Sequence, residues 1–134
     1  MKKILLTLLA LLTVAPLLAQ SDTLALGYCK GAVASEGMAT QKGNTWVSAA
    51  IPLPGETMAA YQGNSVAHVR VALCSRSNID TLRVWVRKTL KGENLAEGYI
   101  TMKTDTRIKK GWNVVELNAP YAITGERLYI GFDL

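Results

Sequence analysis

The fold is decided at the end of the chain, by the stretch GWNVVELNAPYAITGERLYIGFDL that runs from Gly111 to Leu134. Its first half alternates in character with a period of two, and its second half places Leu128, Ile130 and Phe132 on one face. A period of two predicts β-strands. The proline and glycine between the two halves predict a turn. We therefore expect a strand, a turn and a second strand here.

The second of these strands runs to the end of the chain, and no polar or turn-forming residues follow it. An unpaired apolar strand at the edge of a sheet invites aggregation, so natural domains cover or blunt such edges. We therefore expect an open edge on the final strand, as in the front part of a larger β domain. A second copy could cover that edge by strand exchange.

The rest of the chain after residue 19 also consists of short alternating segments bounded by Gly, Asn, Ser and Asp. One short helix is expected at Gly55–Tyr61, because Pro54 and Glu56 suit the start of a helix. Short strands with no long helix between them predict an all-β fold, an antiparallel sandwich or barrel. The expected strands before the final pair are 23–30, 45–52, 65–75, 81–89 and 95–104.

Residues 1–19 have the layout of a secretory signal peptide. Lys2 and Lys3 come first, an apolar run follows, and cleavage is expected after Ala19. The apolar run is short for a membrane span, although an uncleaved N-terminal anchor is the alternative. We therefore expect residues 20–134 to be one exported β domain without a membrane span. It would act in the periplasm, on the cell surface or outside the cell.

The formal net charge is +5 at pH 7, and removal of the signal peptide would reduce it. The charged residues are spread along the chain and form no basic arm or basic-aromatic motif. We therefore expect no nucleic-acid partner.

Two cysteines, Cys29 and Cys74, are present. In an oxidising compartment they can form a disulfide, which would close a loop of about 45 residues and add roughly 4 kcal/mol in the chain-entropy model. The alternative is two separately buried thiols. The spacing leaves both open, because it does not show how closely the two Cα atoms approach.

The sequence contains no recognisable catalytic pattern. His68 is the only histidine, and it lies too far along its strand from Cys74 for the hydrogen bond that a thiol nucleophile needs. The spacing of zinc ligands and the glycine-rich phosphate loop are both missing from the sequence. We therefore expect no catalytic residues, no metal and no cofactor, with a small hydrolase on a β scaffold as the weakest alternative.

One group of side chains predicts a binding surface. In the strand expected at 81–89, the aliphatic residues that face the core alternate with Arg83, Trp85 and Arg87, which face outward. Arg70 faces outward on the preceding strand, and the two successive strands are expected to pair. An exposed tryptophan flanked by arginines can stack on a sugar ring or planar group and hold an anionic substituent.

The alternative for Trp85 is that its ring packs against a neighbouring strand. Trp46 and Trp112 lie at strand starts, and we expect them in the core or sealing an edge of the sheet.

Several short motifs carry a resemblance to known domains. In chain order they are Tyr28-Cys29, Val47–Pro54, Ala60–Asn64, Leu82–Arg87, Gly111–Asn113, Pro120-Tyr121 and Tyr129–Phe132. With these motifs the chain resembles the jelly-roll β-sandwich modules of secreted surface proteins in Gram-negative anaerobes. It is similar to the cleaved-adhesin domains of gingipains and to accessory modules beside streptopain-type cysteine proteases. The resemblance implies a jelly-roll-like sandwich, incomplete at its C-terminal end.

The resemblance also implies a non-catalytic binding or adhesion module that recognises carbohydrate or a host or cell-surface protein. The alternative is a pro-domain or accessory domain of a secreted cysteine protease, whose catalytic domain would lie downstream in a longer chain. The residues expected to bind the ligand are Arg70, Arg83, Trp85 and Arg87.

Overall fold

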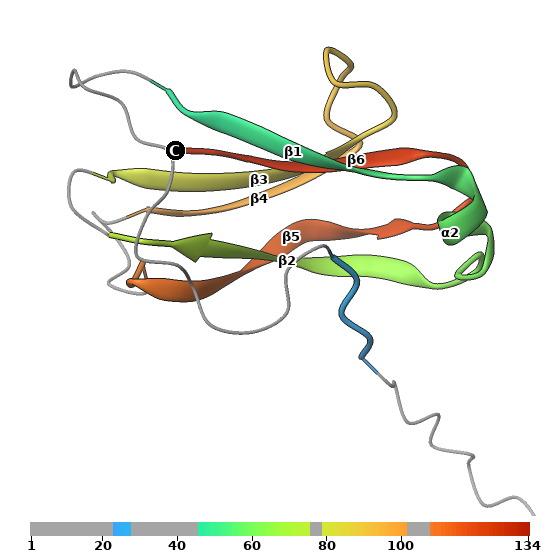
Figure 1. Cartoon of the computed structure of the whole chain (residues 1–134), viewed down its shortest axis with the longest axis horizontal. Coiled ribbons are helices and arrows are strands. Elements are labelled where there is room, and N and C mark those ends of the chain that lie inside the picture. Colours follow the sequence, from blue (N-terminus) through green and yellow to red (C-terminus); the bar gives the residue numbers. More distant parts are fainter. Residues whose placement is uncertain (1–22, 28–45, 76–78, 102–107) are drawn as a thin grey trace, which may run out of the picture.

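The computed structural model describes residues 23–27, 46–75, 79–101 and 108–134. Within these ranges the chain forms the all-β antiparallel sandwich that the sequence predicts. Figure 1 shows two layers, a four-stranded sheet and a two-stranded sheet, with a short helix at one end. The elements are β1 (Ser48–Leu53), α2 (Gly55–Ala59), β2 (Ser65–Leu73), β3 (Thr81–Arg87), β4 (Ala96–Thr101), β5 (Gly111–Ala122) and β6 (Leu128–Asp133).

The final strand lies in the interior of the larger sheet. This sheet, called sheet A below, has the strand order β1-β6-β3-β4, and sheet B pairs β2 with β5. β6 therefore has antiparallel partners on both sides, β1 and β3. The expectation of an open edge on the final strand is wrong, because both rows of its backbone groups face a neighbouring strand. No strand exchange is needed to cover it.

The core fills the space between the two sheets. The inward-facing residues of β2 and β3 are buried, as their alternation predicts, namely Val69, Val71, Leu73, Leu82, Val84 and Val86. Other elements complete the core with Leu53, Met58, Ile100, Ile108, Val115, Leu117, Ile123 and Leu128. Burial of each such side chain contributes about 1.5–3 kcal/mol, so these two faces hold the layers together.

Helix α2 closes one end of the sandwich. It begins after Pro54 and carries Glu56 in its first turn, and Met58 is fully buried against the core. The helix expected at Gly55–Tyr61 is confirmed in a slightly shorter form. Among the described residues, no helix combines the length and the apolar character that a membrane crossing requires.

The two sheets meet directly where β4 packs against β5. A Cβ atom built on Gly98 of β4 would lie 1.9 Å from the carbonyl oxygen of Glu116 on β5. Any residue with a side chain would push the two backbones apart, so glycine permits the close approach at this side of the sandwich.

Several expected strands begin or end a few residues away from the observed bounds, and two differences are larger. Residues 23–27 form no strand and are exposed. Leu24 and Leu26 would form the apolar face of such a strand. They are 63% and 40% exposed, so they do not pack against the core of the sandwich. β5 continues through Pro120, because the register against β2 shifts between Val66 and His68, and a proline fits such a bulge, where no ladder N–H is required.

The signal peptide of residues 1–19 and Cys29 lie outside the described residues, and so do residues 28–30 of the expected strand 23–30. Cys74 is half-buried just after β2. The signal peptide and the disulfide therefore stay predictions.

Candidate functional site

The outer face of sheet A carries the residues expected on β3. Arg83, Trp85 and Arg87 point outward because the alternate positions of β3 fill the core. The register sets Asp133 of β6 opposite Arg83 and Gly131 opposite Trp85. Sequence alternation therefore brings the three predicted residues together on one face.

Trp85 packs over the neighbouring strand and is only 3% exposed. A Cβ atom on Gly131 would come within 2.2 Å of its indole ring, so the ring fills the space that a side chain on β6 would take. The guanidinium carbon of Arg87 lies 3.8 Å from the ring centroid. The expectation of Trp85 as an exposed stacking surface is wrong, because Gly131 lets the ring settle on the sheet and Arg87 covers it.

Asp133 is the hydrogen-bonding centre of this face. Its Oδ1 accepts a bond from the Ser48 hydroxyl (2.7 Å) and one from the Trp85 indole N–H (3.2 Å). Its Oδ2 accepts bonds from Nε (2.9 Å) and Nη2 (2.6 Å) of Arg83. Burial alone would raise the pKa of Asp133, but the bonds from Ser48, Arg83 and Trp85 and the charge of Arg83 outweigh burial and hold the pKa below its usual value.

Arg87 has a different set of partners, all of them neutral. Its Nε donates to Oδ1 of Asn94 (2.6 Å) and its Nη1 donates to the carbonyl of Leu90 (3.0 Å). Asn94 in turn donates through Nδ2 to Glu97 (2.6 Å). Among the described residues, no carboxylate lies within ion-pair distance of Arg87.

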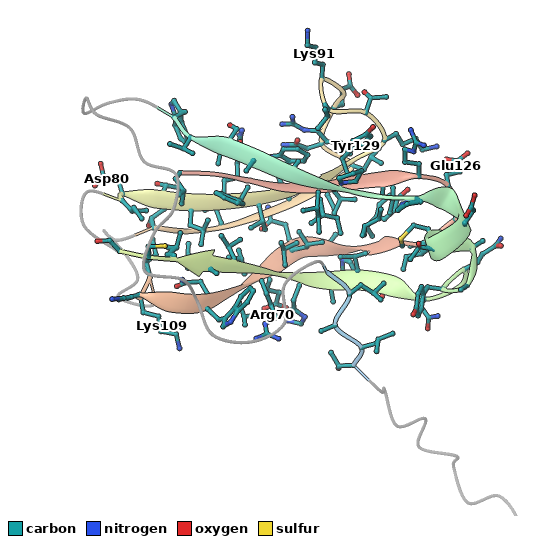
Figure 2. The ribbon with its side chains drawn as sticks, in the orientation of Figure 1. Arg70, Asp80, Lys91, Lys109, Glu126 and Tyr129 are labelled. Carbon is teal, nitrogen blue, oxygen red and sulfur yellow. The ribbon has the colours of Figure 1, made fainter. Side chains whose placement is uncertain are left out.

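These residues line a shallow, open pocket of roughly 450 Å³. Trp46, 66% exposed, stands before β1, and Leu90, 55% exposed, belongs to the β3–β4 loop. This loop rises above sheet A (Figure 1), with Lys91 near its tip (Figure 2). The lining consists of Trp46, Ser48, Ala49, Ala50, Arg83, Trp85, Arg87, Leu90 and Asp133.

Arg70 lies on the other side of the molecule. β2 pairs with β5 and not with β3, because the link from β2 to β3 crosses from sheet B to sheet A. Figure 2 shows Arg70 on the opposite side of the sandwich from Lys91. Its guanidinium lies over the ring of Trp112 at 4.9 Å. The expectation that Arg70 joins the residues of β3 in one patch is therefore wrong.

Sequence reasoning missed Trp46 as a pocket residue. It is exposed and lines the pocket, so the expectation of a core or edge-sealing residue is wrong for Trp46. A signal was present, because Trp46 is followed by small residues, Ser48 and Ala50, at the alternate positions of the strand. A tryptophan followed by small residues on the same face of a strand is the pattern expected for the wall and floor of a shallow pocket.

The described residues contain no group of three or more His, Cys, Asp and Glu side chains that could hold a metal ion. His68 is exposed on β2, in the sheet opposite the pocket. The pocket therefore offers aromatic and guanidinium groups for recognition. Comparison with known proteins gives no match to any family model, curated protein or solved structure.

Proposed function

We propose that this chain is an exported, non-catalytic module that binds carbohydrate through the pocket on the outer face of sheet A. The observation that carries the proposal is one pocket lined both by an exposed indole, Trp46, and by a guanidinium, Arg87, that hydrogen bonds hold in place. Export is supported by the signal-peptide layout of residues 1–19.

Carbohydrate suits the chemistry of this pocket. A sugar ring presents an apolar face that can stack on an aromatic ring, and hydroxyl groups that need hydrogen-bond partners. Trp46 and Leu90 supply apolar surface, and Arg87 supplies donors.

The two arginines of the pocket are held in place by hydrogen bonds within the protein. Asp133 holds Arg83 by two hydrogen bonds, and Asn94 and Leu90 hold Arg87. Side chains that are already ordered lose little entropy on binding, which favours affinity.

A non-catalytic role is supported by how the polar groups are used. The carboxylate of Asp133 accepts four hydrogen bonds, and its lowered pKa keeps it ionised and unfit as a general acid. The Ser48 hydroxyl donates to Asp133, and the single histidine, His68, lies in sheet B. The carboxylate of Asp133 is the base that this hydroxyl contacts, and its lowered pKa makes it too weak a base to activate the hydroxyl as a nucleophile.

The test is a glycan array followed by calorimetric titration of the best ligand. Trp46→Ala should weaken binding at least about tenfold, equivalent to roughly 1.4 kcal/mol. Tyr99→Ala is the matched control, because Tyr99 is an exposed aromatic residue (58%) on β4 that does not line the pocket. A blank array, or equal loss of binding in both variants, would contradict the proposal.

A further inference from the structure

We infer that the sugar bound by this pocket carries an anionic group, a carboxylate or a sulfate, and that Arg87 binds it. The inference rests on the proposed function, since it names the class of carbohydrate for the same pocket. It follows from a difference between the two arginines that line the pocket, Arg83 and Arg87.

Arg83 already has an anionic partner within the protein. Its Nε and Nη2 both donate to Oδ2 of Asp133, at 2.9 and 2.6 Å. Asp133 is 5% exposed, and its carboxylate is fixed further by Ser48 and Trp85. The positive charge of Arg83 is therefore balanced by a group that an incoming ligand could displace only by breaking this network.

Arg87 keeps its charge without a carboxylate partner in the described part of the chain. Its Nε donates to the amide oxygen of Asn94, and its Nη1 donates to the backbone carbonyl of Leu90. Its Nη2 takes part in neither of these two hydrogen bonds. Its guanidinium lies over Trp85 at the pocket. A guanidinium fixed in this way binds a planar or tetrahedral oxyanion more strongly than it binds a neutral acceptor.

The negative charge of Glu97 partly offsets the positive charge of Arg87, although the two side chains are linked only through Asn94. Glu97 accepts a hydrogen bond from Asn94, whose oxygen accepts the bond from Arg87. The hydrogen bonds from Arg87 to Asn94 and from Asn94 to Glu97 orient the guanidinium and place a negative charge one residue away from it. Removing that charge while keeping the hydrogen bond should strengthen the attraction of Arg87 for an anion.

The experiment compares three trisaccharides by calorimetric titration at low ionic strength. They are an oligouronide, its neutral counterpart with CH₂OH in place of each carboxylate, and a sulfated form of the neutral sugar. We expect at least one anionic ligand to bind about tenfold or more tightly than the neutral one. The anionic ligand that binds more tightly than the neutral one identifies the group as a carboxylate or a sulfate.

Variants assign the effect to Arg87. Arg87→Gln should abolish the preference for the anionic ligand. The affinity for the anionic ligand should fall about tenfold or more, and the affinity for the neutral ligand, which loses only a neutral hydrogen bond, should fall much less. Arg127→Gln is the control, because Arg127 is exposed just before β6 and does not line the pocket. Glu97→Gln keeps an oxygen for Asn94 and should raise anionic affinity a few-fold, which provides a test even where Arg87→Gln disturbs folding.

The outcomes separate this inference from the proposed function. Equal affinity for the neutral and anionic sugars overturns the inference and leaves carbohydrate binding intact. An unchanged anionic preference in Arg87→Gln also overturns it. Failure of all three sugars, together with a blank glycan array, overturns the proposed function and the inference with it.

Discussion

Asp133 determines how the outer face of sheet A is arranged at the scale of single residues. One carboxylate accepts bonds from Ser48, Trp85 and Arg83, which lie on two other strands. Its partners are distant in sequence, 85 residues away for Ser48 and 50 for Arg83. Its own strand brings them together only after the sheet has formed. Asp133 therefore links the order of the pocket to the completed fold.

The charge of Asp133 should make stability depend on pH. Its pKa is lower in the folded chain than in the unfolded chain, so the ionised form stabilises the fold above about pH 4, the usual value for aspartate. This contribution is lost as the pH falls through the folded pKa. Asp133→Asn should lower the free energy of unfolding by about 1–3 kcal/mol at pH 7. This loss relative to the wild type should become smaller as the pH falls toward 3.

Urea unfolding at the two pH values measures this effect. Asp80→Asn is the control, because Asp80 is exposed just before β3. If Asp133→Asn lowers the free energy of unfolding by the same amount at pH 7 and at pH 3, the charge of Asp133 does not explain its contribution to stability.

The contact between β4 and β5 is decisive at the scale of secondary-structure elements. These strands belong to different sheets, and Gly98 brings the backbone of one against the backbone of the other. The β3–β4 loop, which carries Leu90 and Asn94, leads directly into β4. The position of β4 therefore affects both the closure of the sandwich and the partners of Arg87.

Gly98→Ala should weaken this closure. The added Cβ would lie 1.9 Å from a backbone oxygen, which cannot rotate away as a side chain could. We expect a loss of about 1–3 kcal/mol in the free energy of unfolding, as for other overpacked sites. Gly55→Ala is the matched control, because a Cβ there would meet its nearest atoms at 3.5 Å, an ordinary contact. Urea unfolding with Gly98→Ala as stable as Gly55→Ala would contradict the close approach of β4 and β5.

Local patterns predicted the strands well but their partners poorly. Alternation along β2 and β3 correctly separates Val69 and Val84, which face the core, from Arg70 and Arg83, which face outward, because burial of one face is a local property. Pairing is not local. The crossing from sheet B to sheet A after β2 separates Arg70 from the pocket, and the insertion of the final strand between β1 and β3 removes its expected open edge.

The pocket also depends partly on local alternation and partly on strand pairing that the sequence does not reveal. Arg83, Trp85 and Arg87 share a face by parity alone. The burial of Trp85 depends on Gly131, which lies on another strand and has no side chain. Trp46 joins the pocket because β1 pairs with β6, a contact that the alternation of either strand does not reveal.

The whole molecule has two outer faces with different character. Sheet A presents the pocket with Trp46 and Arg87. Sheet B presents Arg70 over Trp112 beside Val114, which is 57% exposed. The pocket is the better binding surface, because it is concave and contains an arginine without a carboxylate partner in the described part of the chain. The two faces lie on opposite sides of the sandwich, so one experiment can distinguish them.

Titration of the isotope-labelled protein with the oligouronide, followed by two-dimensional NMR, tests this account most directly. We predict that chemical shifts change for the Trp46 indole, Ala50, Arg87 and Leu90, which line the pocket. Arg70 and Val114 should stay unchanged. Shift changes confined to the face of sheet B, or no changes at ligand concentrations that saturate binding by calorimetry, would contradict a carbohydrate site on sheet A.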